Sequence, residues 1–272
     1  MVKATLSRVS VVVLDWDETI TVADTMSILA NATNDPSRWS GFVDAYMADM
    51  KAYEDSFGTR ETLEDHYRFL GGLSECEYKS VARIELAGVF KGVTHADIQR
   101  VASEVKIRSG FKEFCHKLGV AVEREILSVN WSSEFICSAL ANAVVTDHWT
   151  ITANRIEFDG AGTGTGGVSK DKEGGIRTGM DKLRILESRL GACHERGGLL
   201  MYIGDSNTDL PALLAADIGV IFGDNRSLQQ TCDKYGITVR SFSELCAKDY
   251  VEKEKESKVL YRARKWEEII LE

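Results

Sequence analysis

Residues 9–19, with the sequence VSVVVLDWDET, decide the fold class of this chain. The first six residues are mostly β-branched and apolar, which is typical of a central parallel strand buried on both faces. Two aspartates, Asp15 and Asp17, follow this strand directly. Because open α/β sheets bind their ligands at the carboxyl ends of the strands, we expect both side chains to lie at a binding site.

The pattern on either side of this strand predicts two domains. Residues 21–108 show helical periodicity and no convincing strand, which predicts an inserted all-helical cap domain. Strands and helices alternate again from residue 109, so residues 1–20 and 109–272 are predicted to form one core domain. The predicted fold class is α/β, with a Rossmann-like, mostly parallel sheet, helices on both of its faces, and the cap.

Three later segments carry more local expectations. Residues 149–159 (WTITANRIEFD) alternate apolar and polar side chains, which predicts an antiparallel pair of strands. Residues 159–179 are rich in glycine and polar, which favours a mobile loop with little core of its own. Residues 252–272 are densely charged, and we expect them to form a terminal helix.

Composition excludes several classes of function. The formal net charge of −9 argues against a general nucleic-acid-binding protein, which needs a basic face, but leaves room for a small phosphorylated metabolite as substrate. The six cysteines form no CxxC pair, so we expect reduced thiols and a cytoplasmic protein. No segment is apolar over the length of a membrane span, and nothing in the sequence indicates the oligomeric state.

The spacing of Asp15 and Asp17 suits phosphoryl transfer. Two carboxylates two residues apart after a strand can point at one centre. One can attack phosphorus, as carboxylate nucleophiles do when they form aspartyl-phosphates, and the other can protonate the leaving oxygen. A helix cap or turn would also account for either aspartate alone.

Two further residues are candidates for binding the phosphoryl group. Ser128 ends the predicted strand EREILSV, where its hydroxyl can donate to a phosphoryl oxygen, although Ser132 and Ser133 are rivals for this role. Lys182 lies in the first turn of a predicted helix, where the helix dipole disfavours a cation. A lysine there makes sense if it neutralises a phosphate, whereas an ordinary surface lysine is the alternative.

A second acidic pair follows the predicted strand LLMYI. Asp205 and Asp209 are four residues apart between strand and helix, a spacing that can hold a hard divalent cation directly and through its hydration shell. Mg²⁺ prefers oxygen ligands and is the cofactor we expect. A helix N-cap explains either residue singly, but explains the pair less well.

Together, the motifs DxDxT, Ser, Lys and GDxxxD resemble the haloacid dehalogenase superfamily over nearly the whole chain, with the helical cap of its phosphoserine-phosphatase-like branch. The resemblance implies a phosphoric monoester hydrolase with Asp15 as nucleophile and Asp17 as general acid and base. It implies that Ser128 and Lys182 hold the phosphoryl group. Asp15, the backbone carbonyl of Asp17, and Asp205 would bind Mg²⁺, with Asp209 in support. A mutase shares the first motif and stays open.

The substrate expectation rests on a narrower resemblance. The stretches DWDETIT and LSVNWSSEFI look like the phosphatase domain of plant and fungal thiamine monophosphate phosphatases, which implies a role in thiamine metabolism. Trp131 and Asn130 would then bind the substrate, with Trp131 stacking on a planar heterocycle, although core packing also explains a tryptophan. The alternatives are a pyrimidine nucleoside monophosphate, phosphoserine, pyridoxal phosphate, or a non-catalytic binding protein on the same scaffold.

Overall fold

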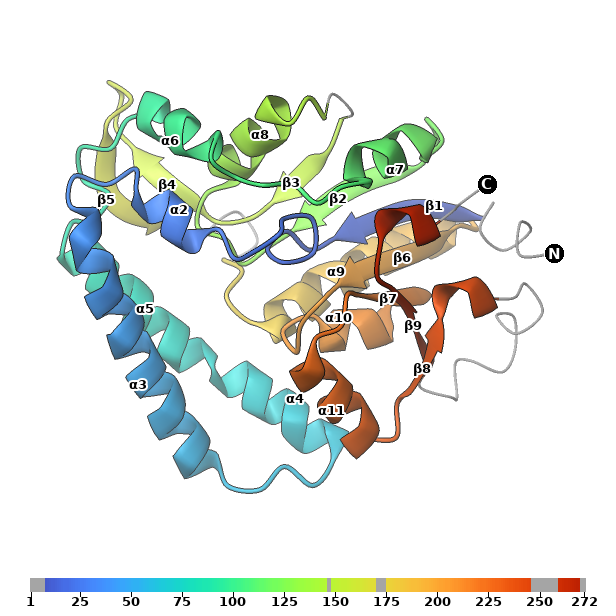
Figure 1. The fold of residues 1–272 in the computed structure, drawn as a ribbon. Helices are drawn as coiled ribbons and strands as arrows, with labels where there is room; N and C mark the ends of the chain where they lie inside the picture. Colours follow the sequence, from blue (N-terminus) through green and yellow to red (C-terminus); the bar gives the residue numbers. More distant parts are fainter. Residues whose placement is uncertain (1–7, 146–147, 170–174, 246–258, 270–272) are drawn as a thin grey trace.

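The computed structural model describes residues 8–145, 148–169, 175–245 and 259–269. Seven strands form a single sheet in which every neighbouring pair is parallel, in the order β3-β2-β1-β6-β7-β9-β8 (Figure 1). The strands are β1 (Val9–Leu14), β2 (Glu123–Leu127), β3 (Thr150–Thr152), β6 (Leu199–Gly204), β7 (Ile218–Phe222), β8 (Thr238–Ser241) and β9 (Val259–Ala263).

Helices cover both faces of this sheet. In β1, Val12 and Leu14 pack into the core on one face, whereas Val11 and Val13 pack into the core on the other. This alternation is the two-residue period of a strand buried on both sides. The first face is covered by α7 (Phe111–Lys117) and α8 (Ser133–Asn142), and the second by α9 (Gly179–Glu195), α10 (Leu210–Ala215) and α11 (Arg226–Lys234). The predicted α/β sheet with helices on both faces is confirmed.

The chain between β1 and α7 is helical, as expected. Two of its helices begin with capping boxes, in which Thr62 pairs with Asp65 and Thr94 with Asp97. The long helices α3 and α5 lie side by side away from the sheet, and α4 reaches toward α11 (Figure 1). The helices are α2 (Met26–Ala30), α3 (Trp39–Phe57), α4 (Leu63–Gly72), α5 (Ser74–Leu86) and α6 (His95–Ala102), with a 3₁₀ turn η1 (Pro36–Arg38).

The two connections between this helical segment and the sheet run next to each other. The N–H of Val22 donates to the carbonyl of Lys106, and the N–H of Arg108 donates to the carbonyl of Ile20, both at 2.9 Å. The last helix of the segment, α6, packs against α8 of the core rather than with α3 and α5. The helical segment therefore leaves and rejoins the sheet at one place, while α4 and α5 also contact α9 and β5 (Gly164–Ser169).

The predicted antiparallel pair within residues 149–159 is wrong. β3 joins the edge of the main sheet in parallel with β2, and β4 (Arg155–Phe158) pairs antiparallel with β5 (Gly164–Ser169) instead. The alternation of side chains was a true strand signal, but Asn154 interrupts it. The buried amide of Asn154 bonds the carbonyls of Val129 and Ile176, which fixes a bend between the two strands.

Two further expectations need correction. The glycine-rich stretch 159–179 is not simply a loop, because it contains β5, in which Val168 is buried. The charged tail does not form the expected helix: β9 lies inside the sheet between β7 and β8, and a 3₁₀ turn η3 (Trp266–Glu268) follows it. Leu260 in β9 and Trp266 in η3 are both buried. A strand between two others is stabilised by packing on both faces, which a solvated terminal helix would lack.

Two general expectations concern membrane spans and thiols. Across the described ranges, no helix is both long and apolar enough to cross a bilayer. The five cysteines that lie within those ranges are free thiols, and Cys246 falls outside them.

Candidate active site

The loop after β1 is shaped by backbone contacts and by one left-handed residue. The N–H of Asp15 donates to the carbonyl of Ile203 at 2.9 Å, which extends the sheet by one residue. Glu18 has a φ of 58°, which is uncommon for a residue other than glycine. Its N–H donates to Thr21 Oγ1 at 3.0 Å, and its carbonyl accepts from the Arg108 guanidinium at 2.8 Å. These contacts hold the turn that separates Asp15 from the following helices.

Asp17 is fixed by neighbours from two other segments. Its Oδ1 accepts from the N–H of Thr25 at 2.8 Å and from the Thr25 hydroxyl at 2.6 Å, and its Oδ2 accepts from the Asn130 amide at 3.2 Å. Burial, and then the negative charge of Asp24, raise the pKa of Asp17 to about 6. A carboxyl group with this pKa can hold or release a proton near neutral pH, as a general acid and base must.

Lys182 is buried at the start of α9. A capping box between Thr178 and Asp181 sets the beginning of the helix, so that Lys182 follows within its first turn. Its Nζ lies 2.6 Å from Asp15 Oδ1 and 2.7 Å from Asp209 Oδ1, and the residue is 1% exposed. Burial alone would lower the pKa of Lys182, but the charges of Asp15 and Asp209 raise it above its ordinary value. Lys182 is therefore a permanent cation beside Asp15.

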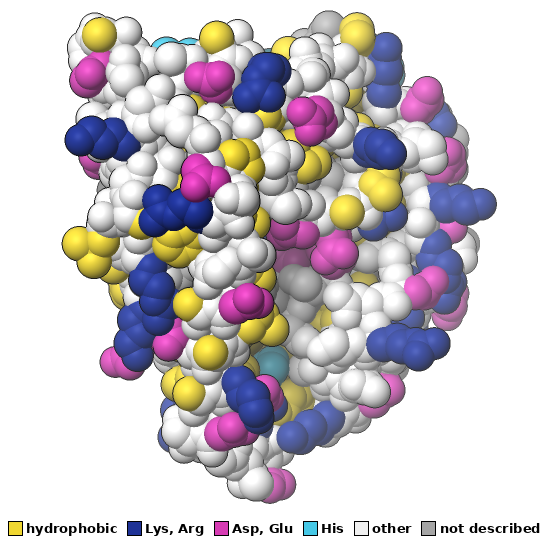
Figure 2. Space-filling model, turned by 60° about the vertical axis from the view of Figure 1, so that its left-hand side comes forward, with side chains coloured by type: hydrophobic (Ala, Val, Ile, Leu, Met, Phe, Trp, Pro, Cys, Tyr) yellow, Lys and Arg dark blue, Asp and Glu magenta, His cyan; other side chains and the backbone are white. Residues whose placement is uncertain are grey.

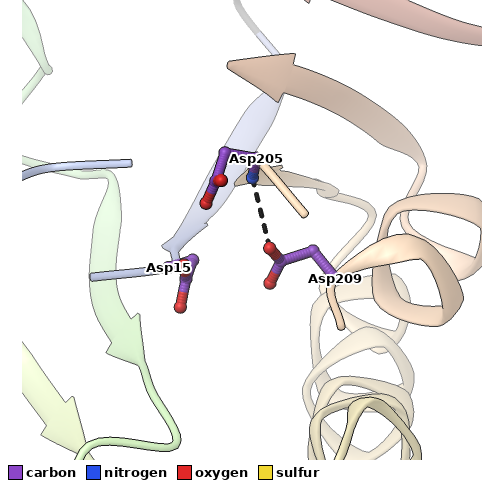
Figure 3. A group of neighbouring side chains, drawn as sticks. All are labelled: Asp15, Asp205 and Asp209. Carbon is purple, nitrogen blue, oxygen red and sulfur yellow. Dashed lines mark hydrogen bonds between the residues drawn. The ribbon is translucent and has the colours of Figure 1, made fainter. Parts of the chain in front are cut away.

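Asp209 is saturated with hydrogen bonds. Its Oδ1 accepts from Lys182 and from the Tyr202 hydroxyl, both at 2.7 Å. Its Oδ2 accepts from the N–H of Asp205 at 3.2 Å, from the N–H of Ser206 at 3.1 Å and from the Ser206 hydroxyl at 2.9 Å (Figure 3). Although burial opposes ionisation, Lys182 and these donors lower the pKa of Asp209. Asp209 is thus an ionised residue that braces the loop carrying Asp205.

The site fits a divalent cation. Side-chain oxygens of Asp15, Asp205 and Asp209 lie within 4.8 Å of one another, and all three residues are buried (Figure 3). Burial and the negative charge of Asp209 raise the pKa of Asp205 to about 7, and the same two causes raise the pKa of Asp15. The charge of Lys182 opposes these shifts but does not cancel them, so a cation that prefers oxygen ligands would further stabilise the ionised carboxylates. Because Asp209 already accepts five hydrogen bonds, Asp15 and Asp205 are the carboxylates left to bind it.

Two glycines allow these segments to approach one another. A Cβ atom on Gly204 would lie 2.5 Å from Asp209 Cγ, and a Cβ atom on Gly179 would lie 2.4 Å from the carbonyl oxygen of Thr208. Both contacts are closer than any real side chain tolerates. The glycines before Asp205 and Lys182 therefore set how closely α9 packs on the loop that follows β6.

The structure separates the candidate serines. Leu14 pairs with Ile126, so Ser128 and Asp15 follow the ends of two neighbouring strands. Ser128 is 1% exposed, and its Oγ accepts from the N–H of Asn130 at 3.1 Å, which leaves its hydroxyl proton to donate. Ser132 is the N-cap of α8 and accepts from the N–H of Phe135, and Ser133 is the first residue of that helix. Of the three, Ser128 is the one that directly follows the strand next to β1, although it is buried beneath the residues that line the cavity described below.

Asn130 and Trp131 have different surroundings. Asn130 is fully buried and bonds Asp17, Thr25 and the N–H of Ser132, so it orients Asp17. It does not line the cavity described in the next paragraph. Trp131 lines the cavity and packs edge-on against Trp39, with ring centroids 5.8 Å apart. Trp131 therefore takes part in the apolar core and in the cavity wall at once.

A cavity of about 720 Å³ opens in front of these groups. Asp15, Asp17, Lys182 and Asp205 line one part of it, and side chains of α3 and α5 line another. Figure 2 shows the hollow on this face, with acidic side chains gathered around it beside hydrophobic ones. The volume is large enough for a substrate considerably bigger than its phosphate group.

Several residues of the site carried no signal in the sequence analysis. Thr25 holds both Asp17 and the indole N–H of Trp16, yet it appears in the sequence only as one threonine among several. Tyr202 lies inside the apolar strand LLMYI, and nothing in that sequence indicates that its hydroxyl donates to Asp209. Lys170 and Lys172, which the sequence offers as weaker candidates for the phosphate-binding role of Lys182, lie outside the described residues.

Comparison with known proteins gives relatives in sequence and in structure, although no family model matches the chain. A CTO1 family protein of Schizosaccharomyces pombe is 29% identical over 233 residues, which cover 82% of this chain and 85% of the relative. Cold tolerance protein 1 of Saccharomyces cerevisiae is 26% identical over 75% of each chain. The mitochondrial bifunctional TH2 protein of Arabidopsis thaliana is 28% identical over 72% of this chain, but the match spans only 34% of that protein.

Solved structures show the same arrangement of strands and helices. A phosphoserine phosphatase solved with an analogue of its phospho-aspartyl intermediate superposes with a TM-score of 0.53 at 13% identity, covering 96% of this chain and 97% of that one. A cytosolic 5′-nucleotidase solved with cytidine superposes with a TM-score of 0.51 at 15% identity, covering 86% and 81%.

The chain therefore has the haloacid dehalogenase fold, in the form that phosphoserine phosphatases and a 5′-nucleotidase share. Within that class it is similar to the CTO1 family protein and to one part of the TH2 protein. The fold implied by the resemblance to haloacid dehalogenase phosphatases is confirmed by the solved structures, and the similarity to part of the TH2 protein agrees with that resemblance.

Proposed function

We propose that this chain is a Mg²⁺-dependent phosphomonoesterase that works through an aspartyl-phosphate on Asp15. The observation that carries the proposal is the position of Lys182 between Asp15 and Asp209, with Asp17 held at the mouth of the same cavity. Phosphoryl transfer depends chiefly on positioning and charge neutralisation, and this arrangement provides both.

The reaction would proceed in two displacements. A carboxylate oxygen of Asp15 attacks phosphorus, the bond from phosphorus to the ester oxygen breaks, and protonated Asp17 gives its proton to that oxygen. Asp17, now ionised, takes a proton from a water molecule that attacks the same phosphorus. The bond to Asp15 then breaks, and inorganic phosphate leaves.

The other groups would neutralise and orient the phosphoryl group. Lys182 and the Ser128 hydroxyl would hold its oxygens. Asp15, the backbone carbonyl of Asp17, and Asp205 would hold Mg²⁺, which supplies Lewis-acid stabilisation of the developing charge. Asp209 would keep Lys182 and the Asp205 loop in place.

Thiamine monophosphate is the first substrate we propose. Trp39 and Trp131 provide aromatic surface in the cavity wall, and several acidic side chains face the same space, which suits a planar and cationic leaving group. Pyrimidine nucleoside monophosphates, phosphoserine and pyridoxal phosphate are the alternatives. We also propose that residues 21–108 act as a cap over this site, which is supported by the side chains of α3 and α5 in the cavity wall. A cytoplasmic location is consistent with the free thiols.

The experiment is phosphate release from thiamine monophosphate, CMP, UMP, phosphoserine and pyridoxal phosphate, with Mg²⁺ and with EDTA. We expect release that requires Mg²⁺ and is lost in Asp15→Asn, a nearly isosteric variant that should keep its circular dichroism spectrum. Full activity of that variant, or release unaffected by EDTA, would refute the mechanism. Transfer to a second sugar position without free phosphate would instead identify a mutase.

A further inference from the structure

Arg177 is the most conspicuous buried group that the proposed reaction does not use. It is 7% exposed and lines the cavity, yet its Nε and Nη1 atoms have no hydrogen-bond partner in the described structure. Leaving charged donors buried and unpaired costs free energy, so such a guanidinium is expected to find acceptors in a ligand. Its backbone N–H, by contrast, is already bonded to Asp181, so the side chain is not needed for the start of α9.

The neighbours of this guanidinium come from the helical segment. The Arg177 guanidinium lies 5.4 Å from the ring centroid of Tyr78 in α5. Burial raises the pKa of Glu77, the residue before Tyr78 in that helix, and the charge of Arg177 partly opposes this rise. Glu77 also lines the cavity, and its Oε1 accepts from the Tyr46 hydroxyl of α3 at 2.5 Å. Because Tyr46 occupies one carboxylate oxygen, the other remains to accept a hydrogen bond. The pair Arg177 and Glu77 thus offers donors beside an acceptor.

This pair lies where the helical segment forms the cavity wall. Glu77 and Tyr78 belong to α5, and the Arg177 guanidinium lies over the Tyr78 ring. Asp15, Lys182 and Asp205 belong instead to the loops after β1 and β6 and to α9. The pair is therefore placed to contact the leaving group of an ester whose phosphate lies at Asp15.

We propose, resting on the phosphatase function above, that Arg177 and Glu77 form a subsite for the edge of an aminopyrimidine in the leaving group. The guanidinium donates to a ring nitrogen or ring carbonyl, and the Glu77 carboxylate accepts from the neighbouring amino group. Trp39 and Trp131, in the same cavity, offer the aromatic surface that such a ring requires.

The walls of the cavity favour a ring over an amino acid. A guanidinium and a carboxylate could also bind the charged groups of phosphoserine. However, a cavity of about 720 Å³ with two tryptophans in its wall far exceeds the size of serine. The same aminopyrimidine edge occurs in thiamine and in cytosine, so the test must include esters of both.

The test compares whole substrates with truncated ones. Thiamine monophosphate is paired with the phosphate of its hydroxyethylthiazole half, and CMP is paired with ribose 5-phosphate, since neither truncated ester carries the pyrimidine. We expect the wild-type chain to prefer the whole ester of at least one pair in kcat/KM. In Arg177→Gln and in Glu77→Gln this preference should fall by about 10–100-fold, the usual effect of losing a hydrogen bond to a charged group. Arg177→Lys keeps the charge but loses the planar fork, and should recover little of it.

The control variant is Arg68→Gln. Arg68 is an exposed arginine of α4 that is bonded to Asp65, so its replacement should leave the preference for the whole ester unchanged. An undiminished preference in both Arg177→Gln and Glu77→Gln, with native circular dichroism, would overturn the subsite, as would a loss confined to phosphoserine. If the wild-type chain releases no phosphate from any ester, the phosphatase proposal fails by itself. Tryptophan fluorescence titrations with thiamine and cytidine then decide the subsite, and absence of binding to both overturns it.

Discussion

Lys182 Nζ lies between two carboxylates, 2.6 Å from Asp15 Oδ1 and 2.7 Å from Asp209 Oδ1. Asp15 follows β1, whereas Asp209 ends the loop after β6, so one buried cation joins two neighbouring strands at their carboxyl ends. The same contact thus contributes to catalysis and to stability, and the two contributions can be separated by experiment.

Replacing Lys182 should destabilise the fold as well as abolish turnover. Lys182→Met keeps most of the side-chain volume but leaves two buried carboxylates unpaired, which typically costs about 3–5 kcal/mol. Without Lys182, the pKa values of Asp15 and Asp209 in the folded variant should rise. Both carboxyl groups then take up protons in the folded variant as pH falls, so its loss of unfolding free energy relative to the wild type should shrink between pH 7 and pH 5. Urea denaturation at both pH values measures it. Lys112→Met, an exposed lysine of α7, should change stability by less than about 0.5 kcal/mol, and an equally small change in Lys182→Met would contradict the prediction.

Thr25 should tune the proton transfer by Asp17. Burial raises the pKa of Asp17, and the two hydrogen bonds from Thr25 stabilise ionised Asp17 and oppose this rise, which leaves the pKa at about 6. Thr25→Val removes the hydroxyl and should raise this pKa, because one donor to the carboxylate is lost. Protonated Asp17 is the acid of the first displacement, so the fall of kcat/KM with rising pH should begin at higher pH in the variant. Comparing both proteins on one alkyl phosphate cancels the titration of the substrate, and superimposable profiles would count against the assignment.

His66 should make the fold sensitive to mild acid. It packs between Phe69 and Tyr235 with its Nε2 buried and unpartnered, and burial, Arg60 and Lys234 lower its pKa to about 4. The unfolded chain takes up a proton near pH 6.5 and the folded chain does not, so stability falls as pH drops from 6.5 toward 4.

The matched variant for His66 is His66→Phe, which keeps an aromatic ring and cannot titrate. Between pH 7 and pH 4, the wild-type chain should lose about 2 kcal/mol more unfolding free energy than this variant. Parallel stability curves in urea would show that His66 is protonated in the folded chain.

Gly204 should not tolerate a side chain. A Cβ atom there would lie 2.5 Å from Asp209 Cγ, so Gly204→Ala must displace Asp209 from Lys182 and Tyr202. We expect a loss of about 1–3 kcal/mol in stability and at least a tenfold loss of kcat. Gly191→Ala is the control, because nothing lies within 4 Å of a Cβ atom at that position in α9. It should stabilise the chain by about 0.5–1 kcal/mol, and a similar gain in Gly204→Ala would refute the packing argument.

The centre of the sheet was predictable because β1 and β6 are buried on both faces and have continuous apolar sequences. The aspartates that follow them were predictable for a related reason, since parallel strands end at one edge and bring Asp15 and Asp205 together. In both cases a local pattern and its tertiary consequence coincide.

The remaining features depend on contacts between distant segments. Thr25 and Glu77 meet the site only because the helical segment folds back over the sheet. Arg177, just before α9, meets α5 for the same reason, and none of the three belongs to a motif. β9 was missed because its five residues lie in a densely charged tail, where local composition outweighed the buried positions of Leu260 and Tyr261.

The place of β9 in the sheet determines when this part of the chain can fold during its synthesis. β8 pairs with β9 and not with β7, although β9 is the last of the described strands to emerge during translation. Until residues 259–263 leave the ribosome, β7 has an open edge and β8 has no partner strand on the sheet. Completion of this side of the sheet must therefore wait until residues 259–263 have been synthesised, whereas β1, β2 and β6 can assemble well before that.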